Sequence, residues 1–452
     1  MEHMQKQKYA GFRYIVETFG CQMNARDSEQ VAGILEDNGF KRANTRDEAD
    51  CLLFNTCCVR EHAEKRVFGN IGALQNWKDE VPGRILGVFG CMMQQMTVAE
   101  KLFRRFPFVN LVFGTSQLES LPLFLDKIAG GERVFAVGCV NSRIEENLPS
   151  IRVAGSSAFV NITYGCNNYC SYCIVPYVRG PERSRAPEAI EKEVRSLTSD
   201  GYSEITLLGQ NVNSYGSHGG TDFLALLERL SNISGLRRLR FMTSHPKDMD
   251  NRLIDSLFTL SPVCHHVHLP LQSGSDRILS AMNRGYTRAQ YTDIVKRLRQ
   301  TADDVEITTD IIVGFPTETE DDFLDTLGMV ECTGFSNAFT FKYSLRTGTK
   351  AAAMHGQIDE DVKRDRLNRL NALQSELAKR RNHRYHGYKG EVLVDGAEER
   401  SAGLPMVYGK FTNNTMVYFP GSASLIGRYV QVRVTGTQKN SLLGERMEES
   451  LC

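Results

Sequence analysis

Three cysteines lie close together near the middle of the chain. Cys166, Cys170 and Cys173 form a C-x3-C-x2-C run directly after an apolar, strand-like segment. Soft thiolates at such short spacing suit an iron–sulfur cluster or a zinc ion. A structural zinc ion takes four protein ligands, and the roughly thirty residues after Cys173 contain no further Cys or His. The spacing favours a four-iron cluster on three cysteines with one iron left open. Zinc, or core cysteines without a ligand, remain alternatives.

Three more cysteines each follow a short apolar run. Cys21, Cys57 and Cys91 come at the ends of the runs 14–19, 52–56 and 85–89, which alternate with stretches of helical pattern. This alternation predicts a βαβαβ unit with a parallel sheet, whose strands end at one edge. A single cysteine at a strand end is usually a small buried hydrophobic residue. Three at equivalent ends predict a second three-thiolate site.

The elements that must position these cysteines divide the chain into three predicted domains of an α/β protein. Residues 10–130 hold the parallel α/β unit. Residues 152–383 contain six strand-like runs separated by helical stretches, which predict a (βα)6 partial barrel with its active face at the strand carboxyl ends. Residues 385–449 show period-two runs broken by Gly and Asn, typical of a small antiparallel β-barrel. The six runs of the partial barrel are 159–164, 204–208, 236–242, 266–269, 306–313 and 337–343.

Composition limits the class of protein. The 452 residues include 12 cysteines, and 41% of the side chains are hydrophobic and 24% charged. No apolar run approaches the roughly 18 residues of a membrane helix, and residues 1–8 lack the apolar stretch of a secretory signal. Cysteines at this density indicate metal or redox duty in a reducing compartment. We therefore expect a cytoplasmic protein without a membrane partner.

A basic segment precedes the predicted C-terminal barrel. The formal net charge is +0, so any attraction to nucleic acid must be local. Between residues 361 and 384 the pattern is helical, and residues 363–389 carry nine basic side chains against two acidic ones. Such a segment is either a solvated helix face or a surface for RNA phosphates. The nine are Lys363, Arg364, Arg366, Arg369, Lys379, Arg380, Arg381, Arg384 and Lys389.

The central cysteine run, with Tyr172 before its third cysteine, resembles the signature of radical S-adenosylmethionine (SAM) enzymes. The resemblance implies that Cys166, Cys170 and Cys173 hold a [4Fe-4S] cluster whose free iron binds SAM. An electron passed to the sulfonium would then release a 5′-deoxyadenosyl radical. A barrel that excludes water and oxygen suits such a reactive species.

The N-terminal motifs resemble the methylthiotransferase branch of that superfamily. Gly20-Cys-Gln-Met-Asn24, Asp27-Ser-Glu29 and Asn55-Thr-Cys57 are similar to its MiaB type, which modifies N6-isopentenyladenosine next to the tRNA anticodon. The resemblance implies a second [4Fe-4S] cluster on Cys21, Cys57 and Cys91, which carries the inserted sulfur, and a C-terminal RNA-binding TRAM barrel. It selects Cys57 over the adjacent Cys58. Further matches are Tyr177-Val-Arg-Gly180, Ser244-His-Pro246, Leu269-Pro-Leu-Gln-Ser-Gly274 and Thr309–Pro316.

Candidate SAM contacts follow from position on the barrel. Gln210 and Asn211 follow the second strand, where the superfamily places a polar motif for the methionine amino group, although a Gly-containing turn is an alternative. Asp310 and Gly314 lie in the strand that passes the adenine, and Thr317 departs from the Gly of relatives, which weakens any role for it. Ser244 and Gln272 are further candidates, and His245 is given no proton-transfer role.

The resemblance implies an enzyme that methylthiolates C2 of the target adenine, with one SAM as methyl donor and a second as radical source. Its partners would be a tRNA anticodon stem-loop, a low-potential electron donor of the flavodoxin or ferredoxin type, and a sulfur donor, and we expect a monomer. Two alternatives stay open. One is a methylthiotransferase for threonylcarbamoyladenosine of tRNA or for a ribosomal protein. The other is a non-catalytic iron–sulfur protein that binds RNA or senses redox state. Cys51, at the start of the strand-like run that leads to Cys57, is expected to pack, and Cys139, Cys264, Cys332 and Cys452 are expected to be incidental.

Overall fold

The computed structural model describes residues 9–58, 63–138, 144–152, 155–217, 219–398, 405–438 and 441–447. The chain forms two compact units. The N-terminal unit comprises residues 1–153 together with 163–167 and 174–185, and the C-terminal unit comprises the remainder. No helix in the described ranges is long and apolar enough to cross a membrane.

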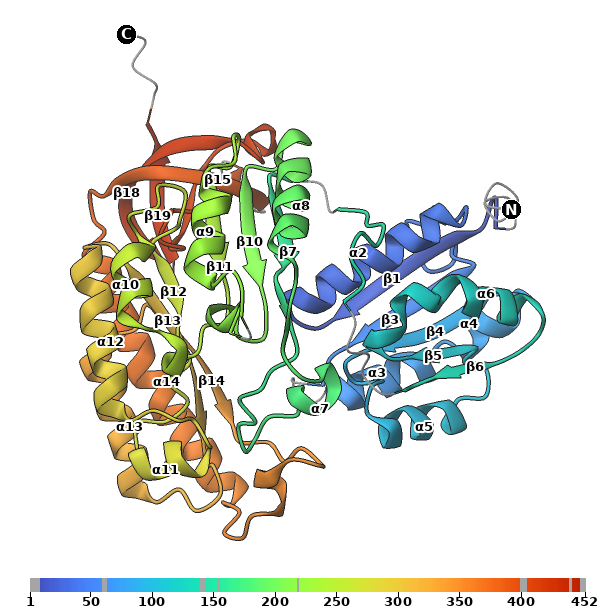
Figure 1. The fold of residues 1–452 in the computed structure, drawn as a ribbon, viewed down its shortest axis with the longest axis horizontal. Coiled ribbons are helices and arrows are strands. Elements are labelled where there is room, and N and C mark those ends of the chain that lie inside the picture. The colour runs from blue at the N-terminus through green and yellow to red at the C-terminus, as the bar shows by residue number, and fades with distance from the viewer. Residues whose placement is uncertain are drawn as a thin grey trace. The chain divides into compact units, whose positions relative to one another are not determined.

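The N-terminal unit is a parallel six-stranded sheet with helices on both faces (Figure 1). Strand order is β2-β1-β3-β4-β5-β6, and the central strands are buried on both sides, which explains their continuous apolar runs. The strands are β1 (Arg13–Phe19), β2 (Lys41–Arg42), β3 (Cys51–Thr56), β4 (Ile85–Gly90), β5 (Leu111–Phe113) and β6 (Val134–Ala136). The helices are α2 (Gln22–Asp37), α3 (Ala63–Gly72), α4 (Gln75–Glu80), α5 (Met96–Arg105) and α6 (Leu121–Ala129).

Two apolar cores cover the faces of this sheet. One core contains α2 and α6 with Leu35 and Leu125 fully buried, and the other contains α3, α4 and α5 with Val67 and Leu102 fully buried. A short segment from the middle of the chain belongs to the same unit. It consists of the hairpin of β8 (Thr163–Tyr164) with β9 (Arg183–Ser184) and of helix α7 (Val175–Arg179).

The C-terminal unit contains six parallel strands in two groups, β11-β10-β7 and β12-β13-β14. One isolated bridge between Leu239 and Val263 joins the groups, so in the described ranges the strands form an open, partial barrel. The strands are β7 (Ser157–Asn161), β10 (Glu204–Leu208), β11 (Arg238–Phe241), β12 (His266–His268), β13 (Glu306–Val313) and β14 (Asn337–Lys342). The helices are α8 (Pro187–Ser199), α9 (Phe223–Ser231), α10 (Asn251–Leu257), α11 (Asp276–Ala281), α12 (Arg288–Thr301), α13 (Glu320–Thr333) and α14 (Glu360–His383). The predicted (βα)6 architecture is confirmed.

The last strands form a closed five-stranded barrel, as predicted. Its order is β15-β16-β17-β19-β18, with one parallel pair, β17 with β19, among antiparallel neighbours. The strands are β15 (Lys389–Glu398), β16 (Met406–Lys410), β17 (Met416–Pro420), β18 (Tyr429–Gln438) and β19 (Ser441–Arg446). The barrel is therefore not wholly antiparallel.

This small barrel packs against the amino ends of the partial-barrel strands. Arg238, at the start of β11, donates Nη1 to the Lys410 carbonyl at 2.8 Å and Nη2 to the Glu391 carbonyl at 2.7 Å. Arg240 donates to the Thr412 and Phe411 carbonyls at 2.9 and 3.0 Å. Both arginines are buried, so these bonds satisfy charged donors inside the unit. The turn after β16 thus closes the end of the partial barrel opposite the strand carboxyl ends.

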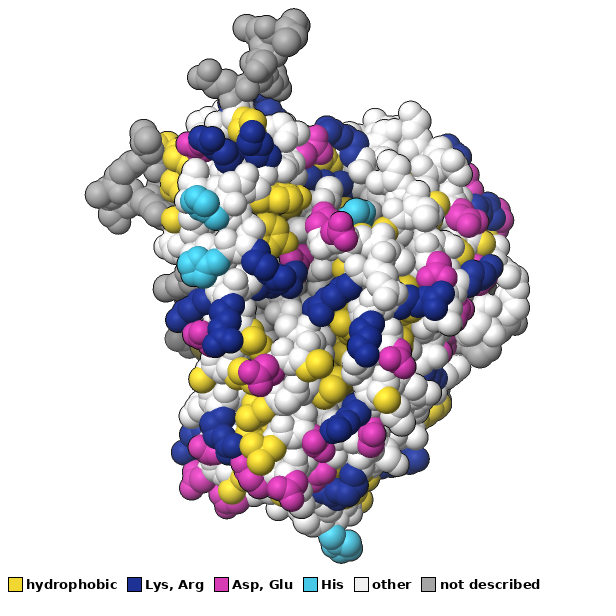
Figure 2. Space-filling view, turned by 90° about the vertical axis from the view of Figure 1, so that its left-hand side faces the viewer, with side chains coloured by type: hydrophobic (Ala, Val, Ile, Leu, Met, Phe, Trp, Pro, Cys, Tyr) yellow, Lys and Arg dark blue, Asp and Glu magenta, His cyan; other side chains and the backbone are white. Residues whose placement is uncertain are grey.

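The basic segment is less available for RNA than its composition indicates. Lys363 and Arg366 are buried, and Arg366 pairs with the buried Glu318 at 2.8 Å. Arg381 forms an ion pair with the buried Glu306. Arg369 and Arg380 pair with exposed carboxylates. On the face shown in Figure 2, basic and acidic side chains are interspersed. Much of the charge of α14 therefore stabilises the fold instead of forming a continuous basic surface.

Candidate active site

Cys21, Cys57 and Cys91 all follow strands that are neighbours in the N-terminal sheet. Phe19 of β1 pairs with Thr56 of β3, and Thr56 pairs with Gly90 of β4. Cys57 and Cys91 come directly after these paired positions, and Cys21 is the N-cap of α2 two residues after Phe19. Cys21 is exposed, and the other two thiols are buried. The register thus carries all three cysteines to one edge of the sheet.

A buried polar network lies beneath that edge. Asn24 and Asn55 are both 0% exposed. Asn24 Nδ2 donates to Asn55 Oδ1 at 2.8 Å, while Asn55 Nδ2 donates to the Asn24 carbonyl at 2.7 Å and to Ser28 Oγ at 2.9 Å. Ser28 Oγ in turn lies 2.7 Å from Thr18 Oγ1. The network ties the start of α2 to the ends of β1 and β3, and so fixes the backbone that carries Cys21 and Cys57.

Two glycines allow this close approach. A Cβ added to Gly20 would lie 2.5 Å from Asn24 Cγ. Gly90 has φ +103°, and an added Cβ would lie 2.4 Å from Asn55 Oδ1 and 2.5 Å from the Thr56 carbonyl oxygen. The Gly-Cys pairs of the sequence motifs are therefore required by packing, since a side chain before Cys21 or Cys91 would displace the network.

Cys58 lies beside Cys91, a contact that sequence reasoning missed. Both thiols are buried in one small cluster with Ile174 and Val178 of the α7 segment. The hydrogen bond between the two thiols lowers the pKa of Cys91 to about 7, and the nearby Arg179 guanidinium acts in the same direction. The same hydrogen bond, together with burial, raises the pKa of Cys58. This edge of the sheet therefore carries four thiols, namely those of Cys21, Cys57, Cys58 and Cys91.

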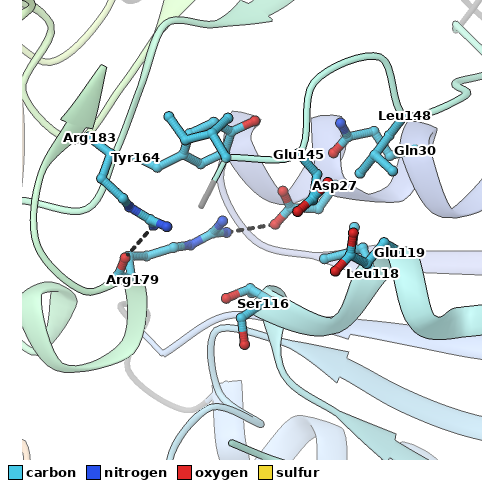
Figure 3. A pocket seen from close by; sticks show the side chains of 12 residues that line it. Asp27, Gln30, Ser116, Leu118, Glu119, Glu145, Leu148, Tyr164, Arg179 and Arg183 are labelled. Carbon is cyan, nitrogen blue, oxygen red and sulfur yellow. Dashed lines mark hydrogen bonds and ion pairs between the residues drawn. The ribbon is translucent and has the colours of Figure 1, made fainter. Parts of the chain in front are cut away.

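Arg179 is the second residue that sequence reasoning did not single out individually. Its Nε donates to Cys91 Sγ at 3.1 Å, and its Nη2 donates to Asp27 Oδ2 at 2.6 Å. Arg179 and Asp27 line a pocket of about 80 Å³. Figure 3 shows both side chains there, with Arg183 donating to the Arg179 carbonyl. The motif Tyr177-Val-Arg-Gly180 thus supplies a cation to the edge that holds Cys91, and Asp27 of the Asp-Ser-Glu motif anchors it.

In the C-terminal unit, hydrogen bonds hold the segment 168–173 at the end of α11. Ser171 donates N–H to the Met282 carbonyl at 2.9 Å and Oγ to the Ala281 carbonyl at 2.8 Å. Buried Arg284 donates Nη1 to Cys170 Sγ at 3.3 Å, and also bonds Tyr172, Tyr286 and the Pro270 carbonyl. Burial raises the pKa of Tyr172, so its phenol stays neutral beside this cation. Cys166 lies in the N-terminal unit, where its N–H donates to the Gly180 carbonyl at 3.1 Å.

Several candidate SAM contacts carry buried polar atoms without a partner. Among the described residues these atoms include Asn211 Oδ1, Ser244 Oγ, His245 Nε2 and Gln272 Oε1. Asn211 follows β10, Ser244 and His245 follow β11, and Gln272 follows β12, so all four lie near strand carboxyl ends. A buried polar atom without a hydrogen-bond partner destabilises the fold, and a bound polar ligand would supply that partner. This chemistry fits a molecule with amino, carboxylate and ribose groups.

Other candidates have different surroundings. Asp310 is half-buried and its Oδ2 lies 3.4 Å from His268 Nε2, so its carboxylate already has a partner. Gln210 also takes part in an interaction within the chain. Gly314 has φ +73° and an added Cβ would lie 2.3 Å from Lys363 Cγ. Thr317 has φ +70°, a left-handed conformation that favours glycine, so the β-branched threonine is locally strained there.

His245 is held neutral. Burial lowers its pKa to about 2, and Arg284 and Lys247 act in the same direction. The Lys247 N–H donates to His245 Nδ1 at 3.3 Å, so the ring proton is on Nε2.

Within the described ranges, no three His, Cys, Asp or Glu side chains are grouped in a way that could hold one metal ion. Cys51, expected to pack, is buried; of the cysteines expected to be incidental, Cys264 is buried and Cys332 is exposed. Cys139 and Cys452 lie outside the described residues.

Comparison with known families matches all three parts of the chain. Residues 13–114 match the uncharacterized protein family UPF0004, residues 160–330 match the radical SAM superfamily, and residues 383–446 match the TRAM domain.

Near full-length relatives carry one name, tRNA-2-methylthio-N(6)-dimethylallyladenosine synthase. The protein from Caldicellulosiruptor saccharolyticus is 48% identical over 435 residues, which cover 96% of this chain and 92% of the relative. The one from Moorella thermoacetica is 47% identical over 434 residues, covering 95% and 97%. That from Clostridium botulinum is 46% identical over 437 residues, covering 96% and 97%.

Solved structures resemble the chain in fold alone. The radical SAM methyltransferase TsrM from Kitasatospora setae, with cobalamin and a [4Fe-4S] cluster bound, gives a TM-score of 0.57 at 14% identity and covers 76% of this chain and 74% of its own. The cobalamin-dependent radical SAM enzyme OxsB gives a TM-score of 0.51 at 12% identity, covering 81% and 56%.

Proposed function

The chain belongs to the tRNA-2-methylthio-N(6)-dimethylallyladenosine synthase family of radical SAM enzymes, and from this premise we propose that it adds a methylthio group to C2 of N6-isopentenyladenosine beside the tRNA anticodon. The methylthiotransferase domain would span residues 10–130, the radical SAM domain 152–383 and the TRAM domain 385–449. The reaction would take place in the cytoplasm, with the anticodon stem-loop of tRNA as its substrate.

One observation carries the proposal most directly: one set of three cysteines follows the neighbouring parallel strands β1, β3 and β4, and a second set of three follows β7 and β8. The donor set of each is three soft thiolates, which suits a cluster with one open iron. We assign Cys21, Cys57 and Cys91 to an auxiliary [4Fe-4S] cluster, and Cys166, Cys170 and Cys173 to the radical SAM cluster. When bound, the two clusters would supply the sulfur for insertion and the reductive cleavage of SAM, respectively.

The residues of the chain would bind and orient the small molecule. Asn211, Ser244 and Gln272 present unpartnered oxygens, which can accept hydrogen bonds from the ammonium and ribose hydroxyls of SAM. The neutral His245 presents an N–H that can donate to a carboxylate or hydroxyl. Gln210 and Asp310 complete the proposed contacts, and Asp310 would have to share its hydrogen bonding with His268.

The RNA, electron and sulfur partners follow from the family. A TRAM domain in relatives named for tRNA modification supports an RNA-binding role for β15–β19. RNA bound by the small barrel must also reach the carboxyl ends of the partial-barrel strands, where the candidate SAM contacts lie. The small barrel packs against the amino ends of these same strands in the C-terminal unit. A stem-loop is long enough to do both, whereas a single nucleoside is not. A low-potential flavodoxin or ferredoxin and a sulfur donor would act on a monomer.

Anaerobic reconstitution with iron counting tests the proposal. We expect about eight iron atoms per wild-type chain and about four in either triple variant, Cys21/Cys57/Cys91→Ala or Cys166/Cys170/Cys173→Ala. The first variant should still produce 5′-deoxyadenosine from SAM and the second should not. Nucleoside mass spectrometry of tRNA from a deletion strain should show loss of the methylthio group from isopentenyladenosine alone. Zinc in place of iron, or no cleavage of SAM by the wild type, would refute the assignment.

A further inference from the structure

Each proposed cluster site has one cysteine sulfur in contact with a buried arginine. Arg179 Nε lies 3.1 Å from Cys91 Sγ in the N-terminal unit, and Arg284 Nη1 lies 3.3 Å from Cys170 Sγ in the C-terminal unit. Both arginines are 4% exposed. A guanidinium cannot lose its proton in a protein, so each site carries a permanent cation at one thiolate.

The cation at the N-terminal site is already neutralised. Asp27 Oδ2 accepts from Arg179 Nη2 at 2.6 Å, and Asp27 itself is 2% exposed. The carboxylate and the guanidinium are thus held together in a place where solvent does not screen them. The Arg179–Asp27 pair therefore acts on Cys91 as a dipole, whose electrostatic effect is weaker than that of a full positive charge.

The cation at the C-terminal site has no such counter-charge. The donors of Arg284 go to neutral acceptors, namely the Pro270 carbonyl at 2.9 Å, Tyr286 Oη at 3.1 Å and Tyr172 Oη at 3.4 Å. In the part of the chain that the structure describes, no carboxylate forms an ion pair with Arg284. Its full charge therefore acts on Cys170 across a low-dielectric interior, where Coulomb interactions are strong.

We propose that Arg284 and Arg179 are positioning residues that bias electron uptake toward the cluster of Cys166, Cys170 and Cys173, because Arg284 is unneutralised whereas Asp27 cancels much of the charge of Arg179. The proposal rests on the two-cluster function above. Reduction of a cluster adds one electron and one negative charge without making or breaking a bond. Reduction potentials of such clusters depend on nearby charge and on hydrogen bonds to the sulfurs, so an uncompensated cation makes reduction easier.

Substitutions of Asp27 and Arg179 test the proposal, because they should shift the midpoint potential of the auxiliary cluster in opposite directions. Asp27→Asn removes the counter-charge but keeps a side chain that can accept from Arg179. The auxiliary cluster should then become easier to reduce, and its midpoint potential should move in the positive direction. Arg179→Gln should move the same potential in the negative direction. A residue with a merely structural role would not move the potential in opposite senses in these two variants.

The measurement uses chains that hold one cluster each. In the Cys21/Cys57/Cys91→Ala background, the remaining cluster is titrated with dithionite and followed by electron paramagnetic resonance, with and without Arg284→Gln and Arg284→Lys. In the Cys166/Cys170/Cys173→Ala background the same titration compares Asp27→Asn and Arg179→Gln. Arg183→Gln is the matched control, since it removes a neighbouring arginine of the same pocket that donates to the Arg179 carbonyl.

We expect a large negative shift for Arg284→Gln and a smaller one for Arg284→Lys, which keeps the charge. The double variant Asp27→Asn/Arg179→Gln, in the same single-cluster background as its parent variants, removes the neutral pair together and should shift the potential of its cluster much less than Arg284→Gln shifts the other. A shift for this double variant as large as that for Arg284→Gln, or a negative shift for Asp27→Asn, would overturn the proposal. If Arg284→Gln prevents folding, the Arg284→Lys shift against Arg179→Lys and the sign for Asp27→Asn decide it. The iron content of the parent backgrounds tests the two-cluster function separately, before any arginine is changed.

Discussion

Replacing Asn55 by alanine should loosen the edge that carries Cys21, Cys57 and Cys91. The substitution removes three hydrogen bonds inside a fully buried network, two with Asn24 and one with Ser28. Each is worth roughly 0.5–1.5 kcal/mol net, so the expected loss is roughly 1.5–4.5 kcal/mol in the free energy of unfolding of the N-terminal unit. For a unit of this size, that corresponds to a fall of about 3–18 °C in Tm.

The single tryptophan makes this measurable. Trp77 is the one Trp of the sequence and is buried in α4 of the N-terminal unit, so its fluorescence reports on that unit alone. Urea denaturation of the iron-free protein, followed by this signal, should show a lower midpoint with an unchanged slope. Iron bound after reconstitution should fall at the same time, because the strand ends that carry the ligands are no longer fixed.

Asn110→Ala provides the matched control. Asn110 Oδ1 accepts one bond from the Leu86 N–H at 3.0 Å, away from the cysteine edge. We expect a loss of about 1 kcal/mol and unchanged iron content. If Asn55→Ala unfolds at the wild-type urea concentration, or binds the wild-type amount of iron, the network does not position the site.

Three further predictions follow from the same geometry. Cys57→Ala should lose about four iron atoms per chain while Cys58→Ala keeps them, and equal losses would make both thiols ligands. Gly90→Ala should destabilise the N-terminal unit by roughly 3 kcal/mol or more, since strain at φ +103° adds to the clash with Asn55, whereas Gly131→Ala, at φ +87° in open space, should cost about 1 kcal/mol. The pKa of His245, lowered to about 2, means that only the unfolded state binds its proton between about pH 6.5 and 2. The stability of the C-terminal unit, followed by circular dichroism, should therefore fall as pH decreases below about 6.5, by up to about 1.4 kcal/mol per pH unit from this group, and His245→Gln should remove that part of the slope.

Sequence patterns predicted the strands well where both faces of a strand are buried. The runs before Cys57 and Cys91 are apolar except for Asn55 and Thr56, and they became β3 and β4 with every residue buried. The prediction for residues 159–164 was less accurate, since the structure divides this stretch between β7 and β8. A boundary of that kind depends on which unit each residue joins, and residues 163–164 pair with Arg183 and Ser184.

Residues that act across the chain were harder to predict. Arg179 stands 88 positions from Cys91 and 152 from Asp27, and no local pattern relates them. The basic residues of α14 also have partners that the local sequence does not indicate. Their partners Glu318 and Glu306 lie in other elements, so a count of charges along the helix could not reveal that they are neutralised.

The sequence alone indicated which thiols are candidate iron ligands, and it determined the order of strands and helices that carries them and the family to which the chain belongs. These follow from residue type, short spacing and periodicity, all of which are local. Only the tertiary structure decided that Asn24 and Asn55 brace one cysteine edge, that Cys58 faces Cys91, and that Asp27 neutralises one arginine while Arg284 keeps its charge. Those outcomes depend on the registers and burial reached when distant segments pack, because hydrogen bonds and Coulomb interactions act through space.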